Sequence, residues 1–408
     1  MTETGGTGTE PADRHASWLE LFFDLVVVVA VAQLAHRLLH PAWSDVALFV
    51  MLYYAVWSIW TSFTLYANVR ADKTRMRSML VGMFGIAVMA AAAPDVAHNI
   101  PGVGVHDDWF AAAYIVCRLS ASRSIQQSGA VMTAWPAAQL GVGLAPWLAS
   151  FWAEPPATYW MWAAGILLDL AFTLRQARDP GRMLQGFQAQ AERLNARLLR
   201  RAARGGQARA VPMPHDAVLH TAHLGERLGL FVIIVLGEAV MQIVVEASGQ
   251  DWGTPLRLAA ACAFALVVCL WWLTLQYGLS AVPEAAERGL HPGVALPAHF
   301  VMTAGLVAAA AGLGAVVGEP DAHLHTGIRW VLCAGLAVYF AASAVIGAAT
   351  GARRLWLWGW ALPATLVPVL LGLLGGPLPA WAVAAVLLAG ALWRVTYRPP
   401  ARVAAAPA

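Results

Sequence analysis

Residues 18–40 read WLELFFDLVVVVAVAQLAHRLLH, and this stretch decides the class of the fold. It is long enough for a helix that crosses a hydrocarbon layer about 30 Å thick. Its first turns carry Glu20 and Asp24, and Gln33 and His36 lie near its far end. A charged carboxylate at the centre of a membrane helix costs about 3 kcal/mol. We therefore expect both acids to face a partner inside the protein.

The composition agrees with a polytopic membrane protein whose first partner is the lipid bilayer. Hydrophobic residues make up 59% of the 408 and charged residues only 12%, against about 25% charged in soluble domains. The residues before Trp18 are polar and lack the basic segment and cleavage site of a signal peptide, so we expect the first helix to be retained. The formal charge of +3 gives no reason to expect a nucleic-acid partner.

Apolar runs recur along the chain at lengths that suit membrane-crossing helices. Residues 177–214 form an Arg-rich loop, in which 185–209 predict an exposed amphipathic helix. This loop separates two halves, 18–176 and 215–398, and the polar tails are 1–17 and 399–408. The predicted all-α fold has twelve spans, at 18–40, 45–67, 78–95, 108–128, 131–152, 157–176, 222–247, 256–280, 295–317, 327–350, 354–374 and 378–396.

The two blocks of six spans resemble each other, which predicts an internal repeat of the kind that builds many transport proteins. Glu20 opens the first span and Glu226 opens the seventh. Further residues recur in the second block with matching spacing: Trp60 and Tyr66 as Trp271 and Tyr277, Met83, Val88 and Ala90 as Met302, Val307 and Ala309, and Trp162 and Arg175 as Trp381 and Arg394.

The basic residues predict the orientation in the membrane. Lys and Arg concentrate in the loops on the side of the N-terminus, whereas the opposite loops carry mostly Asp and Glu. Because basic loops stay in the cytoplasm, we expect both termini to be cytoplasmic. Six spans per half is an even number, so the two copies would have the same orientation.

Ionisable residues within spans are the candidates for function, because each must be paired, neutral or exposed to water. In the seventh span, Glu238, Gln242 and Glu246 recur every four residues, which predicts a polar stripe that faces inward. Arg118, midway along the fourth span, needs a carboxylate partner, and Asp24, Glu238 and Asp169 are the alternatives.

Other polar residues have a structural explanation as well as a functional one. Glu226 and Arg227 lie at the start of the seventh span beside His223, where charge pairing at a helix end or snorkelling also explains them. His299, early in the ninth span, is a single histidine on an apolar face and is a weaker candidate.

The sequence gives no indication of a metal, a cofactor or a disulfide framework. The histidine pairs lack the spacing of metal sites, and no phosphate-binding loop, dinucleotide turn or nucleophile elbow occurs. The four cysteines all fall in apolar segments, where we expect them to act as small buried fillers.

Three stretches are similar to those that characterise the bacterial low temperature requirement A (LtrA) family of membrane proteins. They are WLELFFDLVVVVAVAQLAHRL, TLYANVRADKTRMR and HLGERLGLFVIIVLGEAVMQI, in this order along the chain. The resemblance implies a bacterial cytoplasmic membrane protein but no settled activity. Ala239 departs from the family pattern, which more often has Ser after LGE. The resemblance implicates Glu20, Asp24, Gln33, His36, Tyr66, Asn68, Arg70, Glu226, Arg227, Gly237 and Glu238.

Three functions follow from these observations as alternatives. The first is a secondary transporter of an unidentified small molecule, with a site lined by Asp24, Glu238, Gln242 and Arg118 and with a proton as the coupling ion. The second is an enzyme that acts on a lipid or isoprenoid, with Asp24 or Glu238 as general acid or base. The third is a structural or signalling protein whose Arg-rich loop binds anionic lipid.

Overall fold

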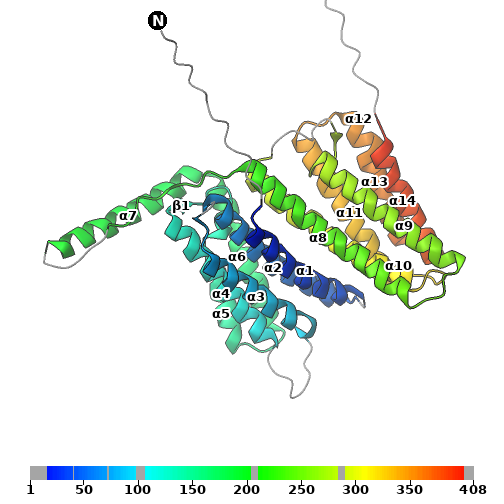
Figure 1. Cartoon of the computed structure of the whole chain (residues 1–408), viewed down its shortest axis with the longest axis horizontal. Helices are drawn as coiled ribbons and strands as arrows, with labels where there is room; N and C mark the ends of the chain where they lie inside the picture. Colours follow the sequence, from blue (N-terminus) through cyan, green and yellow to red (C-terminus); the bar gives the residue numbers. More distant parts are fainter. Residues whose placement is uncertain are drawn as a thin grey trace, which may run out of the picture.

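The computed structural model is built almost entirely of helices (Figure 1). It describes residues 16–39, 41–70, 73–97, 106–203, 210–283 and 290–398. The helices of the first half are α1 (Trp18–His36), α2 (Trp43–Arg70), α3 (Met76–Ala92), α4 (His106–Ser128), α5 (Leu144–Ala149) and α6 (Ala157–Ala177). Helix α7 (Pro180–Ala202) follows, and then come α8 (Thr221–Ser248), α9 (Thr254–Trp271), α10 (Pro292–Gly318), α11 (Thr326–Ala349), α12 (Arg354–Trp356), α13 (Leu362–Leu374) and α14 (Ala380–Thr396).

The apolar helices confirm a multi-pass membrane protein. Nine helical segments among the described residues are long and apolar enough to cross a membrane, and Ala380–Thr396 is a shorter apolar helix. The fourth predicted span, 108–128, is helical as α4 but is not among the nine. Expected spans 222–247, 295–317 and 327–350 correspond closely to α8, α10 and α11.

The fifth predicted span, 131–152, is not a continuous helix, so this prediction was wrong. The chain forms the two-residue strand β1 (Ala130–Val131), a 3-10 turn at Pro136–Ala138, the short helix α5 and a second 3-10 turn at Ser150–Trp152. Pro136 and Pro146 lack an N–H donor, and Gly141 and Gly143 favour irregular backbone. We call 130–143 the broken segment.

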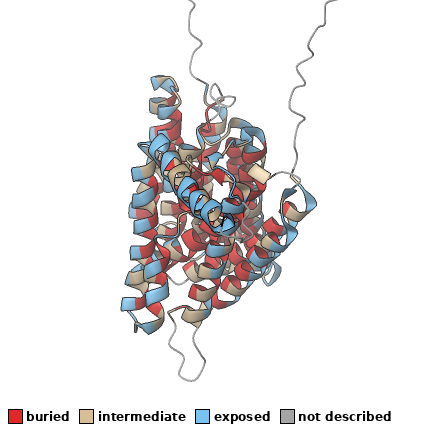
Figure 2. Ribbon diagram, turned by 90° about the vertical axis from the view of Figure 1, so that its left-hand side faces the viewer, coloured by how far each residue is buried: buried red, intermediate tan, exposed pale blue. Residues whose placement is uncertain are grey.

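The Arg-rich loop contains the expected amphipathic helix, α7. Only Met183 and Ala191 of this helix are buried. Figure 1 shows α7 reaching away from the bundle, and in Figure 2 it lies in front with mostly exposed residues. After α7, β2 (His215–Asp216) pairs in parallel with β1 and so attaches the loop to the broken segment.

Helix α2 lies at the centre of the molecule. It contacts α1, α3 and α4 in its own half and α8 and α10 in the other. Every residue from Leu52 to Asn68 is buried. The outer helices instead expose apolar side chains, such as Phe22 and Leu25 of α1, because lipid rather than water surrounds them.

Helix α1 begins and α14 ends on the same side of the bundle (Figure 1). Glu20, at the start of α1, contacts His223, at the start of α8. Arg398, just after α14, donates to Tyr277, just after α9. We call this the α7 side, because α7 also lies here.

Candidate functional site

A buried ion pair joins α1 to α8 across the boundary between the halves. Arg227 donates from Nη1 to Oδ2 of Asp24 over 2.5 Å and from Nη2 to Oδ1 over 2.8 Å. The indole Nε1 of Trp60 donates to the same Oδ1 over 2.8 Å. Asp24 is 3% exposed and Arg227 is fully buried. The two-point geometry and the extra donor are what a buried pair needs to offset the loss of water.

A second polar group lies about one helical turn closer to the α7 side. Asn68 donates to the backbone oxygen of His220 over 3.0 Å and accepts from its N–H over 2.9 Å, which fixes the orientation of the amide. The same amide nitrogen lies 3.0 Å from Nδ1 of His223, so this ring nitrogen is the acceptor. The proton of the neutral ring then sits on Nε2.

That Nε2 of His223 lies 3.3 Å from Oε1 of Glu20. The two atoms are not aligned as a hydrogen bond, so the contact is electrostatic. The other oxygen of Glu20 accepts from the backbone N–H and the hydroxyl of Ser17, both over 2.8 Å. Glu20 therefore caps its own helix while it faces α8.

His299 of α10 is held in one neutral form beside the ion pair. Trp57 donates to its Nδ1 over 3.1 Å, and its Nε2 lies 3.1 Å from the backbone oxygen of Leu228. Because Nδ1 is the acceptor, Nε2 carries the proton. The ring also stacks on Trp60 with centroids 5.7 Å apart. Aromatic packing thus links His299 to Asp24.

The expected inward stripe on α8 is present. Gln242 donates to Oε1 of Glu238 over 2.7 Å, while Oε2 has no partner among the described residues. Both residues are buried. Gly314 and Gly318 of α10 give the stripe its space, since an added Cβ would meet Gln242 or Glu246. Glu238 lies roughly 16 Å along α8 from Arg227, at about 1.5 Å per residue.

Arg118 binds Asp169, the third of the partners that the sequence allowed. Nη2 donates to Oδ2 of Asp169 over 2.8 Å and to the backbone oxygen of Leu140 over 3.1 Å. Asp169 in turn accepts from the N–H of Gly143 over 2.8 Å. The pair thus binds one backbone carbonyl and one backbone N–H near the end of the broken segment, midway along α4 and α6.

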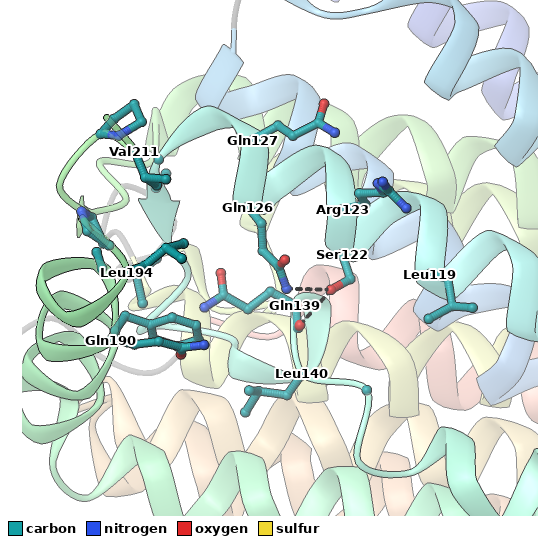
Figure 3. A pocket seen from close by; sticks show the side chains of 18 residues that line it. Leu119, Ser122, Arg123, Gln126, Gln127, Gln139, Leu140, Gln190, Leu194 and Val211 are labelled. Atoms are coloured by element: carbon teal, nitrogen blue, oxygen red, sulfur yellow. Dashed lines mark hydrogen bonds between the residues drawn. The ribbon is translucent and has the colours of Figure 1, made fainter. Parts of the chain in front are cut away.

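A cavity of about 1020 Å³ opens beside the broken segment on the α7 side. Figure 3 shows Gln126, Ser122 and Gln139 in a hydrogen-bonded series along one wall, with Gln190 and Leu194 of α7 opposite. Gln126 donates to Ser122 over 3.2 Å, and Ser122 donates to the backbone oxygen of Gln139 over 2.7 Å. Among the described residues, the lining combines apolar side chains, such as Phe187 and Leu194, with neutral hydrogen-bonding groups and one cation, Arg123.

The predicted site residues therefore fall into three places. Asp24, Arg227, Glu20, Asn68 and His299 form one connected group, Glu238 and Gln242 form a second, and Arg118 belongs to a third with Asp169. His36 is exposed at the end of α1, and Glu226 is half-buried.

Sequence reasoning missed the indole partners Trp57 and Trp60 and the cavity wall at Gln139. The Pro and Gly residues of the broken segment were a sequence signal for the cavity wall at Gln139. No local sequence pattern indicates the roles of Trp57 and Trp60, because these depend on the rotation of α2 relative to α1 and α10.

Among the described residues, no group of three or more His, Cys, Asp or Glu side chains could hold a metal ion. The four cysteines are free, and three of them are buried.

Comparison with known proteins gives one family and one distant relative. The family model described as Bacterial low temperature requirement A protein (LtrA) matches residues 15–392. An uncharacterized protein of Rhizobium meliloti, RA0937, is 25% identical over 344 residues, which cover 77% of this chain and 74% of that protein. No solved structure matches the chain significantly.

Proposed function

The chain belongs to the bacterial low temperature requirement A family, and on that premise we propose that it is a secondary transporter of a small polar molecule. The transporter lies in the bacterial cytoplasmic membrane with both termini in the cytoplasm. Its substrate enters the cavity beside the broken segment, and movement of the two halves exposes that segment to the other side.

The observation that carries this proposal is the non-helical backbone between α4 and α6, where Leu140 and Gly143 bind the Arg118–Asp169 pair midway along those two helices. Irregular backbone in a membrane is tolerated only where protein buries it or where it lines a water-filled cavity. The broken segment meets both conditions, because Arg118 and Asp169 bind its polar groups and its residues 139–141 line the cavity. Discontinuous spans of this kind form the substrate sites of many secondary transporters.

We further propose that the halves are copies of one six-span unit. The neighbours of equivalent helices support this, since α1 packs on α3 as α8 packs on α10, and α3 packs on α4 as α10 packs on α11. Glycines allow the second contact in both halves. An added Cβ on Gly85 would meet Cys117, and one on Gly305 would meet Gly335. The last span of each half also contacts the second, α6 with α2 and α14 with α9.

The Asp24–Arg227 pair is the contact that changes between states in this proposal. It joins α1 to α8, so rocking of one half against the other stretches it. Separating Asp24 from Arg227 while both are charged would leave two unpaired buried charges and would cost several kcal/mol. A proton on the carboxylate reduces that cost, which couples the movement to protons. Glu238 is a second proton carrier, because one of its oxygens has no partner among the described residues.

Helix α7 supports the orientation and provides a second membrane contact. Its exposed face carries Arg193, Arg197, Arg200 and Arg201. Basic side chains near a membrane surface attract the anionic lipids of the cytoplasmic leaflet. We propose that α7 rests on that leaflet and forms the outer wall of the cavity.

The geometry favours transport over the enzymatic alternative. Asp24 already accepts three hydrogen bonds from Arg227 and Trp60, so it is not poised to remove a proton from a substrate. Asp24, Asp169 and Glu238 are not among the described residues that line the 1020 Å³ cavity.

The proposal is tested first in proteoliposomes that enclose a pH-sensitive dye. Pools of amino acids, monosaccharides and nucleosides are added outside, and we expect at least one pool to move protons with the wild-type protein. Glu238→Gln should abolish this movement. Proton movement that is unchanged by both Glu238→Gln and Asp24→Asn contradicts proton coupling.

A second experiment needs no substrate. Gly141 lines the cavity, whereas the adjacent Val142 is exposed but is not among the lining residues, so Gly141→Cys and Val142→Cys form a matched pair. A membrane-impermeant maleimide, added from each side in turn, should label the Gly141→Cys variant from either side but the Val142→Cys variant from one side at most. The unsubstituted protein gives the background of the four natural cysteines. Labelling of the Gly141→Cys variant from one side only, under every condition, contradicts alternating access.

A further inference from the structure

Arg394, in the last turn of α14, is buried, and no described residue forms an ion pair with it. It is 1% exposed. Its Nη2 donates to the hydroxyl of Ser343 over 2.7 Å, whereas Nε and Nη1 have no acceptor among the described residues. None of the ion pairs of the described residues includes Arg394. An arginine cannot lose its charge in a protein, so this site keeps a full positive charge out of water.

Aromatic rings surround the guanidinium but do not satisfy it. Its carbon lies 3.7 Å from the ring centroid of Trp360 and 5.0 Å from that of Phe340. A ring face attracts a cation, but it accepts few hydrogen bonds. The in-plane N–H groups therefore remain unpaired within the described part of the chain.

The hydroxyl groups nearby are already committed. Ser343 donates its own proton to the backbone oxygen of Phe340 over 3.1 Å. Thr274 donates to the backbone oxygen of Leu270 over 2.8 Å, so Tyr339, 2.6 Å away, must donate to Thr274. Of these three hydroxyl groups, only that of Ser343 accepts a hydrogen bond from Arg394.

Two further donors of the same cluster lack an acceptor in the described ranges. The indole N–H groups of Trp356 and Trp360 are buried and unpaired there, and their rings lie 6.3 Å apart. With Nε and Nη1 of Arg394, four donor atoms without an acceptor gather in one cluster. Buried donors are nearly always paired in folded proteins, so this concentration calls for an acceptor that the described residues do not supply.

The backbone around the cluster is unusual as well. Trp360 lies in a π-helical turn, Leu357–Ala361, and Thr274 lies in another, Trp272–Gln276. Such turns are rare and occur frequently at functional sites. Both lie near the α7 side, close to the end of α14.

We propose that Arg394, Trp356 and Trp360 form a binding site for an oxyanion, either a carboxylate or a phosphate group. The planar guanidinium presents paired N–H groups that match two oxygens of such a group. The indole N–H groups supply further donors, and the aromatic rings exclude water. The oxyanion belongs to a free solute or to a lipid headgroup. The site is independent of the cavity by the broken segment.

The test uses the purified full-length chain in phosphatidylcholine nanodiscs. Thermal unfolding is followed in sodium phosphate, sodium acetate and sodium chloride at matched ionic strength. A second set of nanodiscs contains phosphatidylglycerol, in chloride only. Stabilisation by phosphate or acetate identifies a free anion, and stabilisation by phosphatidylglycerol alone identifies a lipid headgroup. No stabilisation in any arm overturns the proposal.

Variants assign the effect to the cluster. Arg394→Gln should lose the stabilisation, and Arg394→Lys should weaken anion binding about tenfold, because it keeps the charge but not the fork. Trp360→Phe keeps a ring beneath the guanidinium and removes only the N–H, so it tests the site even if Arg394→Gln does not fold. Arg175→Gln, an exposed arginine at the end of α6, is the control and should behave as wild type. Unchanged anion stabilisation in both Arg394→Lys and Trp360→Phe overturns the proposal.

Discussion

Arg118 in the first half and Arg394 in the second are both buried, but the protein satisfies them in opposite ways. Arg118 faces Asp169 and also donates to Leu140 and Ser62. Arg394 has one hydroxyl, on Ser343, and an indole face. Within the described ranges Nε is unpaired in both, but only Arg394 leaves Nη1 without an acceptor. Arg118 therefore stabilises the protein's own irregular backbone, whereas Arg394 has hydrogen-bond donors that, in our proposal, bind another molecule.

The largest loss of stability is expected when the Arg118–Asp169 ion pair is removed. Asp169→Ala leaves the Arg118 charge uncompensated and frees the N–H of Gly143, so we expect a loss of about 3–5 kcal/mol in unfolding free energy. The measurement is unfolding of the purified protein in mixed micelles. Glu192→Ala, on the exposed face of α7, is the control. A variant as stable as wild type would show that the broken segment does not depend on this pair.

The Asp24–Arg227 pair provides the next test. Arg227→Met alone should cost about 3–5 kcal/mol, because it leaves a buried carboxylate unpaired. The double variant Asp24→Leu with Arg227→Met should recover most of that stability, since apolar groups can replace a buried pair. Transport should fail in both. If the double variant is as unstable as the single one, the pair acts through something other than its charges.

Arg394→Met is expected to cost far less than the change at Asp169. No carboxylate is left behind among the described residues, so without an added anion we expect a change of about 1 kcal/mol or less, in either direction. The same micelle unfolding assay measures it. A loss as large as that of Asp169→Ala would mean that Arg394 fastens the fold as Arg118 does, and the contrast between the two would fail.

The smallest effect is expected at Arg175, the counterpart of Arg394 in the proposed repeat. Arg175 is exposed at the end of α6, so Arg175→Gln should change the unfolding free energy by about 0.5 kcal/mol or less. A large loss here would indicate that this end of α6 has a buried partner in the membrane, and the two halves would then be more alike than the structure suggests.

The sequence predicted correctly those features that depend on the residue pattern within a single helix. Apolar length predicted most of the membrane helices, and the amphipathic, Arg- and Gln-rich pattern of residues 185–209 predicted α7. The stripe of Glu238 and Gln242 was also visible, because it follows one helix face. The fifth span was wrong because its average hydrophobicity outweighed the Pro and Gly residues that break it.

Pairings between helices could not be derived in the same way. In a soluble protein, the apolar face of a helix shows which side is buried, but a helix in lipid is apolar on every side. The sequence pattern therefore does not predict how α1 is rotated relative to α8. For this reason Arg227 was interpreted as a charge at a helix end rather than as the partner of Asp24. For Arg118 the sequence left three acids open, and only the packing of α6 selects Asp169.

The burial of α2 has a consequence for how the protein is made. The helix is synthesised early, yet residues Leu52 to Asn68 are covered partly by α8 and α10, which leave the ribosome much later. Until then the polar groups of α2, Asn68 among them, must contact lipid, the insertion machinery or neighbouring helices of the first half. Domains generally fold in the order of synthesis. The first half is therefore expected to enter the membrane before its packing is complete, and α2 becomes fully buried only when α8 and α10 have been inserted.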